Sequence, residues 1–288
     1  MSKVSIVIPT HNRPELLKRA ILSVLAQTYR DFEVIVVDDG DKPHAKNVVD
    51  GFADVRFRYI AHEPANRGGS VTRNTGIKES RGEYIAFLDD DDEWLPEKLA
   101  LQVEALSHAG EEVGFSATGV ENVTEHGSTQ NKIQNGIYDF SEIVLLRFKG
   151  FITSSLLIRR KVFDDVGFFD ESLPSHQEVD LLIRITRFYK GVGIDLPLVR
   201  MNMTHHDHIG GDLARRILGR ELLLAKHVDI YAKHKKALAK QYFWLAIWCR
   251  DFGQTKKAKE YFWKAFRLSG NPRYLFHALL TEGGGRKT

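Results

Sequence analysis

Residues 84–98 read YIAFLDDDDEWLPEK, an apolar run that ends abruptly in four consecutive aspartates. The first five residues are apolar throughout, as expected of a central parallel strand that is covered on both faces. Side chains alternate along an extended backbone, so Asp89 and Asp91 should point one way and the other two aspartates the opposite way. Four adjacent carboxylates repel one another, and a bound divalent cation would relieve that repulsion.

A solvated acidic turn, or an N-cap before the helix that Pro96 opens, is the simpler explanation of an aspartate run. The position of this run favours a ligand site instead, because open α/β sheets bind ligands just beyond the carboxyl ends of their strands. We therefore interpret the stretch as a metal and diphosphate site.

The residues before this stretch predict three more strands, at residues 4–8, 32–37 and 55–60. Helices are expected between them, from Pro14, around residues 73–77 and after Pro96, since apolar residues recur there at helical spacing. Alternating strands and helices predict an α/β fold with a Rossmann-like, mainly parallel central sheet that is flanked by helices. We take residues 1–120 as a nucleotide-binding half. The Gly68-Gly69 turn has neither the G-x-G-x-x-G nor the Walker A pattern, so neither of those sites is supported.

The next segment, residues 121–212, is predicted less fully. Residues 121–150 give no clear pattern, whereas residues 151–159 and 161–166 indicate a strand and a short helix. Glu178 should open a further helix, and two short strands are expected at residues 192–195 and 198–203.

The last segment, residues 213–288, is predicted to be a basic, all-helical extension. Three helices are expected at residues 237–250, 255–268 and 273–280, separated by glycine and proline breaks. Residues 214–288 carry 17 Lys and Arg against 5 Asp and Glu, a net charge of +12, whereas residues 1–213 carry 24 against 33, a net charge of −9. The two parts of the chain therefore favour different partners.

The composition, 43% hydrophobic and 27% charged over 288 residues, is that of an ordinary globular protein. The single cysteine, Cys249, excludes an internal disulfide framework and indicates a reducing compartment, so we expect a cytoplasmic protein. The first apolar run is too short for a signal peptide, and no stretch reaches the roughly 18 apolar residues of a transmembrane helix.

Four pieces of the sequence occur in a familiar order between residues 3 and 205. They are VSIVIPTHNRPELLKRAILSVLAQTY with FEVIVVDDG, then NRGGSVTRNTGI, then GEYIAFLDDDDEWLPEKL, then GFFDESLPSHQEVDLLIR. Together they resemble the family 2 glycosyltransferases, the large inverting group with the GT-A fold. The resemblance implies an enzyme that binds a nucleoside diphosphate sugar, most often UDP-linked, in its first half and an acceptor hydroxyl in its second half, here residues 121–212.

The resemblance also implies where the donor binds. Asp39 would accept hydrogen bonds from the base, with Asp38 close by, and Arg73 matches the family arginine that approaches base or phosphate. The full set of implied donor-binding residues is Pro9, Thr10, Asn12, Asp38, Asp39, Arg73, Asp89 and Asp90. Asp38 and Asp39 could instead cap a turn, and Arg73 could be an exposed helix charge.

Asp89 and Asp91 match the D-x-D pair of the family. The resemblance implies that Asp91 coordinates Mn²⁺ or Mg²⁺ directly, while Asp89 reaches ribose or the metal through water. Hard cations of this kind are held by one or two carboxylates together with substrate phosphates. Asp90 occupies a variable position of the motif, so its acidity does not indicate a second metal. His205, with His206 and His208, follows a predicted strand, where relatives place a histidine near the diphosphate or the metal. A zinc site is not expected, because the companion Cys or spaced His ligands of such a site are missing.

The general base departs from the family pattern. Relatives commonly have Asp in a sequence such as E-D-x-D-L, whereas this chain has QEVDL at residues 177–181. Glu178 therefore takes the base position, one methylene longer, and would remove the acceptor proton as the oxygen attacks the anomeric carbon opposite the diphosphate. Glu178 could instead complement a helix N-terminus, and Asp180 is the substitute candidate for the base.

The acceptor and the role of the tail are less defined. Because relatives often modify lipid-linked or cell-surface glycans, we expect a glycan or lipid-linked acceptor and peripheral contact of the basic tail with the inner face of the cell membrane. A solvated helical face would also explain the charge. Nucleic acid is not expected, since no reader motif accompanies the charge. A nucleotidyltransferase-like enzyme, or a catalytically weak sugar-nucleotide-binding scaffold, remains the alternative function.

Overall fold

A computed structural model of the 288-residue chain describes residues 3–42, 44–146, 151–202 and 212–281. The chain forms two compact units. The first contains residues 1–140, 149–171 and 178–205, and the second contains residues 141–148, 172–177 and 206–288. Both the predicted nucleotide-binding half and most of the predicted acceptor half lie in the first unit, and the predicted helical extension lies in the second.

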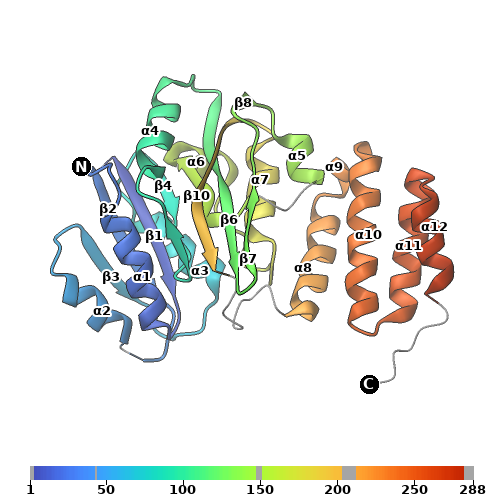
Figure 1. Cartoon of the computed structure of the whole chain (residues 1–288), viewed down its shortest axis with the longest axis horizontal. Helices are drawn as coiled ribbons and strands as arrows, with labels where there is room; N and C mark the ends of the chain where they lie inside the picture. The colour runs from blue at the N-terminus through green and yellow to red at the C-terminus, as the bar shows by residue number, and fades with distance from the viewer. Residues whose placement is uncertain (1–2, 43, 147–150, 203–211, 282–288) are drawn as a thin grey trace. The chain divides into compact units, whose positions relative to one another are not determined.

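The first unit is built on one mixed sheet, whose central path runs in the order β3-β2-β1-β4-β9-β6-β10-β5. Figure 1 shows the strands with helices around them. The strands are β1 Val4–Thr10, β2 Phe32–Asp38, β3 Phe57–Ala61, β4 Tyr84–Phe87, β5 Asp92–Trp94, β6 Val113–Thr124, β7 Gly127–Asn131, β8 Gly136–Tyr138, β9 Leu156–Arg159 and β10 Lys190–Asn202. Strands β3, β2, β1 and β4 are parallel, as are β6 and β10, while β9 runs antiparallel to its neighbours β4 and β6. The predicted α/β fold with a mainly parallel sheet is confirmed.

Helices cover both faces of this sheet because side chains along the buried strands alternate between them. The helices are α1 Pro14–Leu25, α2 His44–Phe52, α3 Gly69–Glu79, α4 Lys98–His108, α6 Arg160–Val166 and α7 Gln177–Ile185, with a 3-10 turn, η1, at Thr153–Ser155. Ile6 and Ile8 of β1 join the core cluster that also contains residues of α1 and α4. Val7, which points the other way, lies against α3 at Gly76, where an added Cβ would be 2.2 Å from Val7 Cγ1.

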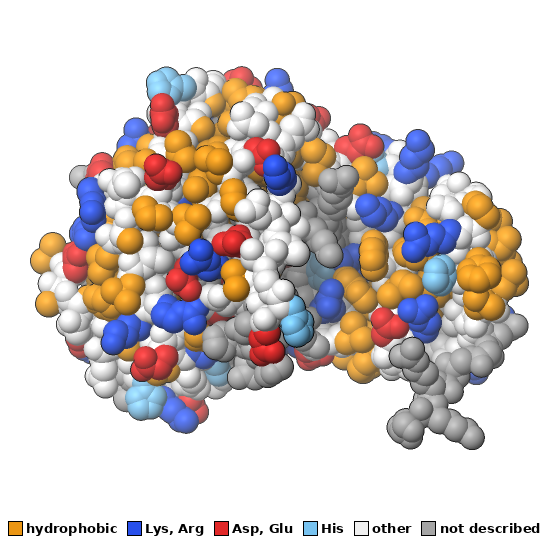
Figure 2. Space-filling view, viewed as in Figure 1, with side chains coloured by type: hydrophobic (Ala, Val, Ile, Leu, Met, Phe, Trp, Pro, Cys, Tyr) orange, Lys and Arg blue, Asp and Glu red, His pale blue; other side chains and the backbone are white. Residues whose placement is uncertain are grey.

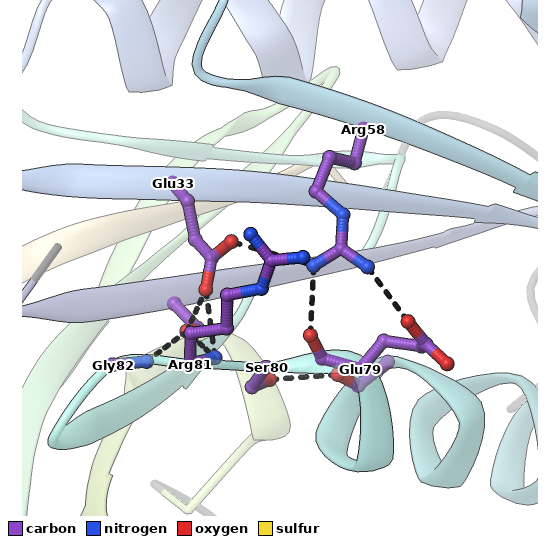
Figure 3. A network of polar contacts seen from close by, with 8 residues as sticks. Glu33, Arg58, Glu79, Ser80, Arg81 and Gly82 are labelled. Atoms are coloured by element: carbon purple, nitrogen blue, oxygen red, sulfur yellow. Dashed lines mark hydrogen bonds and ion pairs between the residues drawn. The ribbon is translucent and has the colours of Figure 1, made fainter. Parts of the chain in front are cut away.

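A buried polar network fixes the turn that leads into β4 (Figure 3). Glu33 of β2 accepts hydrogen bonds from the Ser5 hydroxyl of β1 at 2.7 Å and from the Arg81 backbone N–H at 2.8 Å. Arg58 of β3 lies 3.5 Å from the same carboxylate and pairs with Glu79 at the end of α3. A buried carboxylate is tolerated only when it is paired in this way. The network holds the start of β4 beside the start of β1, and the two parallel strands run towards the same edge of the sheet.

The structure differs from the predicted elements at several places in the first unit. Residues 192–195 and 198–203, predicted as two strands, belong to the single strand β10, whose pairing with β6 shifts register on both sides of Pro197. Proline has no N–H to donate to a ladder, so the strand bulges there instead of ending. Helix α2 and strands β5, β6, β7 and β8 were not predicted.

The second unit is helical. Its helices are α5 Ser141–Leu146, α8 Leu213–Lys226, α9 Val228–Lys233, α10 Lys235–Asp251, α11 Thr255–Ser269 and α12 Pro272–Leu280. The three predicted helices correspond to α10, α11 and α12, and α11 ends at Gly270 in the left-handed conformation, just before Pro272 opens α12. The rings of Phe243, Phe262, Tyr274 and His277 pack together between these helices. This aromatic core agrees with the interpretation of the aromatics as packing residues.

A second packing centre of this unit involves α8 and α10. The guanidinium groups of Arg216 and Arg220 lie 4.3 and 4.4 Å from the centre of the Trp248 ring. Arg220 is almost completely buried and donates to Gln241 and to His176 Nε2.

No helix among the described residues is long and apolar enough to cross a membrane.

Candidate active site

The candidate site lies where the order of the strands reverses. From β1 the chain builds outward through β2 and β3 on one side, and β4 then pairs with the other side of β1. Such a switch point leaves a crevice beyond the carboxyl ends of the two strands, where open α/β sheets bind ligands. Thr10 ends β1, and the aspartate run begins two residues after β4 ends.

The aspartate run alternates between exposed and buried side chains, as its spacing predicted. Asp89 and Asp91 are partly exposed, whereas Asp90 and Asp92 are buried. The segment between β4 and β5 is a turn and not an extended strand, with the Asp92 N–H donating to the Asp89 carbonyl at 3.0 Å. The alternation therefore comes from the turn and from the partners of each carboxylate.

The two buried aspartates hold the turn in place. Asp90 accepts a 2.8 Å hydrogen bond from the Thr10 hydroxyl and is ion paired with Arg13 at 2.8 Å. Asp92 accepts a hydrogen bond from Ser154 Oγ at 2.5 Å. Burial raises the pKa of Asp90 to about 7 although Arg13 acts against this shift, and burial together with the neighbouring carboxylates raises the pKa of Asp92 well above its ordinary value. The assignment of Asp90 to the donor pocket stays a prediction, and its carboxylate is engaged within the fold.

The two partly exposed aspartates each face an arginine. Asp89 is ion paired with Arg73 of α3, and Asp91 Oδ2 lies 3.2 Å from Arg13 Nη1. Burial disfavours the charged guanidinium of Arg73, but Asp89, and more weakly Glu178 and Asp91, outweigh burial and raise the pKa of Arg73. Arg73 is thus within electrostatic range of the proposed metal ligand and of the proposed base.

Asp38 is the last residue of β2, and Asp39, which follows it, organises the loop before α3. Asp39 accepts hydrogen bonds from the backbone N–H groups of Arg67 and Gly68, at 2.9 and 2.7 Å, and from His62 Nδ1 at 2.9 Å. Burial would raise the pKa of Asp39, but these hydrogen bonds outweigh burial and lower it. Asp39 is therefore an ionised carboxylate with most of its lone pairs in use. Its proposed contact with a base needs either the remaining lone pair of Oδ2 or a local rearrangement.

The other predicted donor residues lie at the same edge of the sheet. Asp38 accepts hydrogen bonds from the Tyr59 hydroxyl at 2.7 Å and from the Gly40 N–H at 2.9 Å. Pro9 is a partly exposed residue of β1. Asn12 has a positive φ of 55°, donates to Asp41 at 2.7 Å, and has its buried Oδ1 without a hydrogen-bond partner among the described residues.

The two candidate bases have different surroundings. Glu178 lies in the first turn of α7, is partly exposed, and interacts electrostatically with Arg73. Asp180 is completely buried and accepts two hydrogen bonds from Arg184, at 3.0 and 2.8 Å. A buried carboxylate engaged by an arginine is poorly placed to receive a proton from a substrate, so the geometry favours Glu178.

Of the three predicted metal ligands, Asp89 and Asp91 lie in the turn after β4. His205 lies outside the described residues, as do His206 and His208. Among the residues that the structure describes, no group of three or more His, Cys, Asp and Glu side chains is arranged to hold a metal ion. Asp89 and Asp91 still fit a hard cation whose remaining ligands come from substrate phosphates and water, because such a site needs only one or two protein carboxylates.

Three residues of the site were missed by the sequence analysis. Arg13 follows the first strand in the string THNRPEL quoted above, and its place beside an expected acidic edge was a usable signal. Ser154 and His62 gave no such signal. Ser154 accepts from the Asp89 N–H and donates to Asp92, and it is 62 residues away from Asp92 in the sequence.

The fold and the acidic switch point define a GT-A type glycosyltransferase, a transferase enzyme. The sequence model of glycosyl transferase family 2 matches residues 5–167, more than half of the chain, and the chain belongs to that family.

Relatives agree with this assignment. An uncharacterised glycosyltransferase of Methanocaldococcus jannaschii is 30% identical over 249 residues, which are 84% of this chain and 83% of the relative. The GalNAc(5)-diNAcBac-PP-undecaprenol beta-1,3-glucosyltransferase of Campylobacter jejuni is 25% identical over 98% of this chain and 94% of its own length. An uncharacterised glycosyltransferase of Rickettsia felis is 35% identical over 64% of this chain. This chain spans only about a third of that relative's length (31%).

Solved structures share the fold. Staphylococcus aureus TarS residues 1–349, solved in complex with UDP-GlcNAc, has a TM-score of 0.69 at 16% identity, over 97% of this chain and 79% of that one. The mannosyltransferase PcManGT from Pyrobaculum calidifontis, solved with GDP-Man and Mn²⁺, has a TM-score of 0.65 at 17% identity, over 98% of this chain and 79% of that one.

Proposed function

We propose that this chain transfers a sugar from a UDP-linked donor to a hydroxyl group of a glycan, with inversion at the anomeric carbon and with Mn²⁺ or Mg²⁺ bound. The observation that carries the proposal is the convergence on Arg73: this largely buried cation is ion paired with Asp89 and interacts electrostatically with Asp91 and Glu178. Arg73 of α3 therefore interacts both with the aspartate pair proposed to bind the metal ion and with Glu178 of α7.

The donor is proposed to bind at the switch point. Its diphosphate would lie near Asp89, Asp91 and Arg73, and its nucleoside near Pro9, Thr10, Asn12, Asp38 and Asp39. A divalent cation would be held by Asp91, with Asp89 beside it, and would neutralise the charge that develops on the departing diphosphate. Cation binding at Asp91 would replace its contact with Arg13, which could then turn to a phosphate oxygen. The UDP-GlcNAc complex of the similarly folded TarS supports a uridine nucleotide, and the Mn²⁺ complex of PcManGT supports the metal.

Glu178 is proposed as the single general base. An inverting displacement needs one carboxylate, which takes the proton of the acceptor hydroxyl as that oxygen forms the new bond to the anomeric carbon and the bond to the diphosphate breaks. Glu178 interacts electrostatically with the Arg73 guanidinium, and a neighbouring positive charge favours the ionised form of a carboxylate.

A lipid-linked glycan is the proposed acceptor, because the Campylobacter jejuni relative carries undecaprenol in its name and matches almost the whole chain. The helical unit is proposed to contact the membrane surface. Phe276, Leu279 and Leu280 lie on the outer face of α12 and are 56–59% exposed, and Arg273 is exposed one turn away. Figure 2 shows Lys and Arg side chains interspersed with hydrophobic side chains on the visible face of this unit. Such a combination suits the interface of an anionic bilayer.

Donor hydrolysis tests the proposed activity without knowledge of the acceptor. Purified protein with Mn²⁺ is incubated with UDP-glucose, UDP-GlcNAc, UDP-galactose and GDP-mannose, and release of the nucleoside diphosphate is measured. Slow release from one UDP-sugar, abolished by EDTA and by Asp91→Ala, supports the proposal, whereas release from none of the four contradicts it. Sedimentation with phosphatidylglycerol vesicles at low salt tests the membrane contact, which Phe276→Ser with Leu280→Ser should abolish.

A further inference from the structure

Helices α3 and α7 carry candidate active-site residues and hold the same short loop between them. The loop is residues 166–169, which leads out of α6. Asn74 of α3 binds one end of it and Arg184 of α7 binds the other. We call Asn74, Arg184 and residues 166–169 the brace.

The side-chain amide of Asn74 bonds both backbone polar groups of Phe169, as the backbone of a neighbouring strand would. The Asn74 side chain is 3% exposed. Its Oδ1 accepts from the Phe169 N–H at 3.0 Å, and its Nδ2 donates to the Phe169 carbonyl and to Glu171 Oε1, both at 2.9 Å. Both backbone groups of Phe169 and both N–H bonds of the amide are therefore used. No other side chain of similar size offers a donor and an acceptor in this arrangement.

Arg184 uses all five of its N–H groups. Two contacts go to Asp180, from Nε at 3.0 Å and from Nη2 at 2.8 Å. The others go to three successive backbone carbonyls at the C-terminal end of α6, those of Val166, Gly167 and Phe168. The guanidinium thus caps α6 and binds a buried carboxylate of α7 at the same time. A lysine ammonium has three donors and no planar fork, so it cannot make this set of contacts.

Both ends of the brace are close in the chain or in space to candidate active-site residues. The Phe169 ring lies 5.3 Å from the ring of Phe87, the last residue of β4, and 5.9 Å from the guanidinium of Arg73. Arg73 is ion paired with Asp89 and interacts electrostatically with Glu178. Glu178 lies less than one turn before Asp180 on α7. A series of contacts therefore runs from Asn74, which is next to Arg73 in the chain, through the loop to Arg184 and Asp180, two residues from Glu178.

We propose that Asn74 and Arg184 are positioning residues that set the distance between Glu178 and the donor side of the site. The inference rests on the proposed role of Glu178. Neither residue is close to the reacting atoms in the proposed chemistry, but a base displaced by about 1 Å loses much of its effect. The buried Asp180–Arg184 pair then has its own role, which is to orient the helix that bears the base.

The test uses hydrolysis of UDP-glucose with Mn²⁺, together with calorimetric titration of UDP. Arg184→Lys and Asn74→Asp should each lower kcat at least about ten-fold while the Kd of UDP changes less than about two-fold. The decisive measurement is the same Arg184→Lys change made in a Glu178→Gln protein. If the brace acts through the base, Arg184→Lys should lower the residual rate of Glu178→Gln by less than about two-fold.

Arg159→Lys is the matched control. Arg159 also caps a helix, α4, with donor contacts to the carbonyls of Leu106 and Ala109 at 2.6 and 3.3 Å, and it bonds the Val113 carbonyl at 2.9 Å. It lies opposite Tyr84, at the start of β4 and away from the candidate site. Arg159→Lys should lower the melting temperature as Arg184→Lys does, but leave kcat of the folded protein within about two-fold.

Each outcome decides one question. Equal losses of kcat in the wild-type and Glu178→Gln backgrounds, or an equal loss with Arg159→Lys, would show that Arg184 only stabilises the fold and would overturn the brace. A fully active Glu178→Gln protein overturns the proposed base instead, and this result is obtained before any brace variant is compared. Rates are expressed per folded molecule, with the folded fraction measured by circular dichroism, so that instability cannot imitate a loss of kcat.

Discussion

The hydroxyl of Thr10 donates a 2.8 Å hydrogen bond to Oδ2 of Asp90, joining the end of β1 to the turn after β4 across 80 residues of sequence. Arg13 binds the other oxygen of the same carboxylate. The second aspartate of the run is therefore part of the frame, and it leaves its two neighbours, Asp89 and Asp91, facing outward. The run of four aspartates is therefore divided into a buried pair, Asp90 and Asp92, and a partly exposed pair, Asp89 and Asp91, that is ion paired with Arg73 and Arg13.

Replacing Asp90 should change how stability depends on pH. The pKa of Asp90 is about 7 in the folded protein against 3.8 ordinarily, so between about pH 4 and 7 the folded protein keeps a proton that the unfolded chain has lost. Stability from this group is complete below about pH 4 and is lost as the pH rises towards 7. We expect Asp90→Asn to flatten the fall in unfolding free energy over this window, measured by urea titration with EDTA present.

Asp50→Asn is the control for that measurement, because its exposed carboxylate makes only a surface ion pair with Lys46. Asp92 is also buried with a raised pKa, so part of the pH dependence should survive in Asp90→Asn. A pH profile of Asp90→Asn that is as steep as that of the wild-type protein would contradict the buried, partly protonated state of Asp90.

Removal of the Asp91 carboxylate should abolish metal-dependent activity. We expect Asp91→Asn to lower Mn²⁺-dependent hydrolysis of UDP-glucose by at least about a hundred-fold, because a Lewis acid at the diphosphate contributes several kcal/mol. Binding of UDP should become independent of Mn²⁺, as measured by calorimetric titration with and without the metal. Glu93→Gln, which removes a carboxylate two residues away that pairs with Arg19 and Asn202, should keep its Mn²⁺ dependence. Equal effects of the two variants would argue against Asp91 as a ligand.

The sequence was sufficient for the parts of this fold that depend on local patterns. The apolar runs before Pro9, Asp38 and Asp89 are buried strands. The aspartate run alternates in burial as expected, but it does so in a turn and not in the extended backbone on which the expectation was based. Strand β6 was missed because its sequence, VGFSATGVENVT, mixes small, polar and apolar residues, whose burial depends on neighbours on both sides. Propensity in such a strand reflects tertiary packing more than sequence.

Contacts between distant residues could not be predicted. Asp180 and Arg184 are four residues apart on a helix, so their pairing was readable, but complete burial of Asp180 was not. Asn74 and Phe169 are 95 residues apart, and nothing in either segment indicates the other. The choice between Glu178 and Asp180 depends on these contacts, which is why the sequence left both open.

Two glycines in helices should respond in opposite ways to alanine. At Gly76 of α3 a Cβ would lie 2.2 Å from Val7 Cγ1 in the core, whereas at Gly51 of α2 it would meet nothing within 4 Å. We expect Gly76→Ala to destabilise the protein by about 1–3 kcal/mol through overpacking. Gly51→Ala should stabilise it by about 0.5–1 kcal/mol, because alanine is the better helix former. Urea unfolding measures both, and a neutral Gly76→Ala would mean that α3 does not pack on β1 this closely.

Substitution of the two candidate bases should affect catalysis and stability differently. Glu178→Gln keeps the size of a partly exposed side chain but removes its charge and its ability to take a proton, so kcat should fall by about 10²–10⁴-fold, with a smaller effect on melting temperature than Asp180→Asn. Asp180→Asn weakens a buried pair with Arg184, and unfolding free energy should fall by about 3 kcal/mol. Its kcat per folded molecule should fall much less than that of Glu178→Gln. A nearly active Glu178→Gln protein beside an inactive, stable Asp180→Asn protein would reverse the assignment, since it would require Asp180 to leave Arg184 and reach the acceptor.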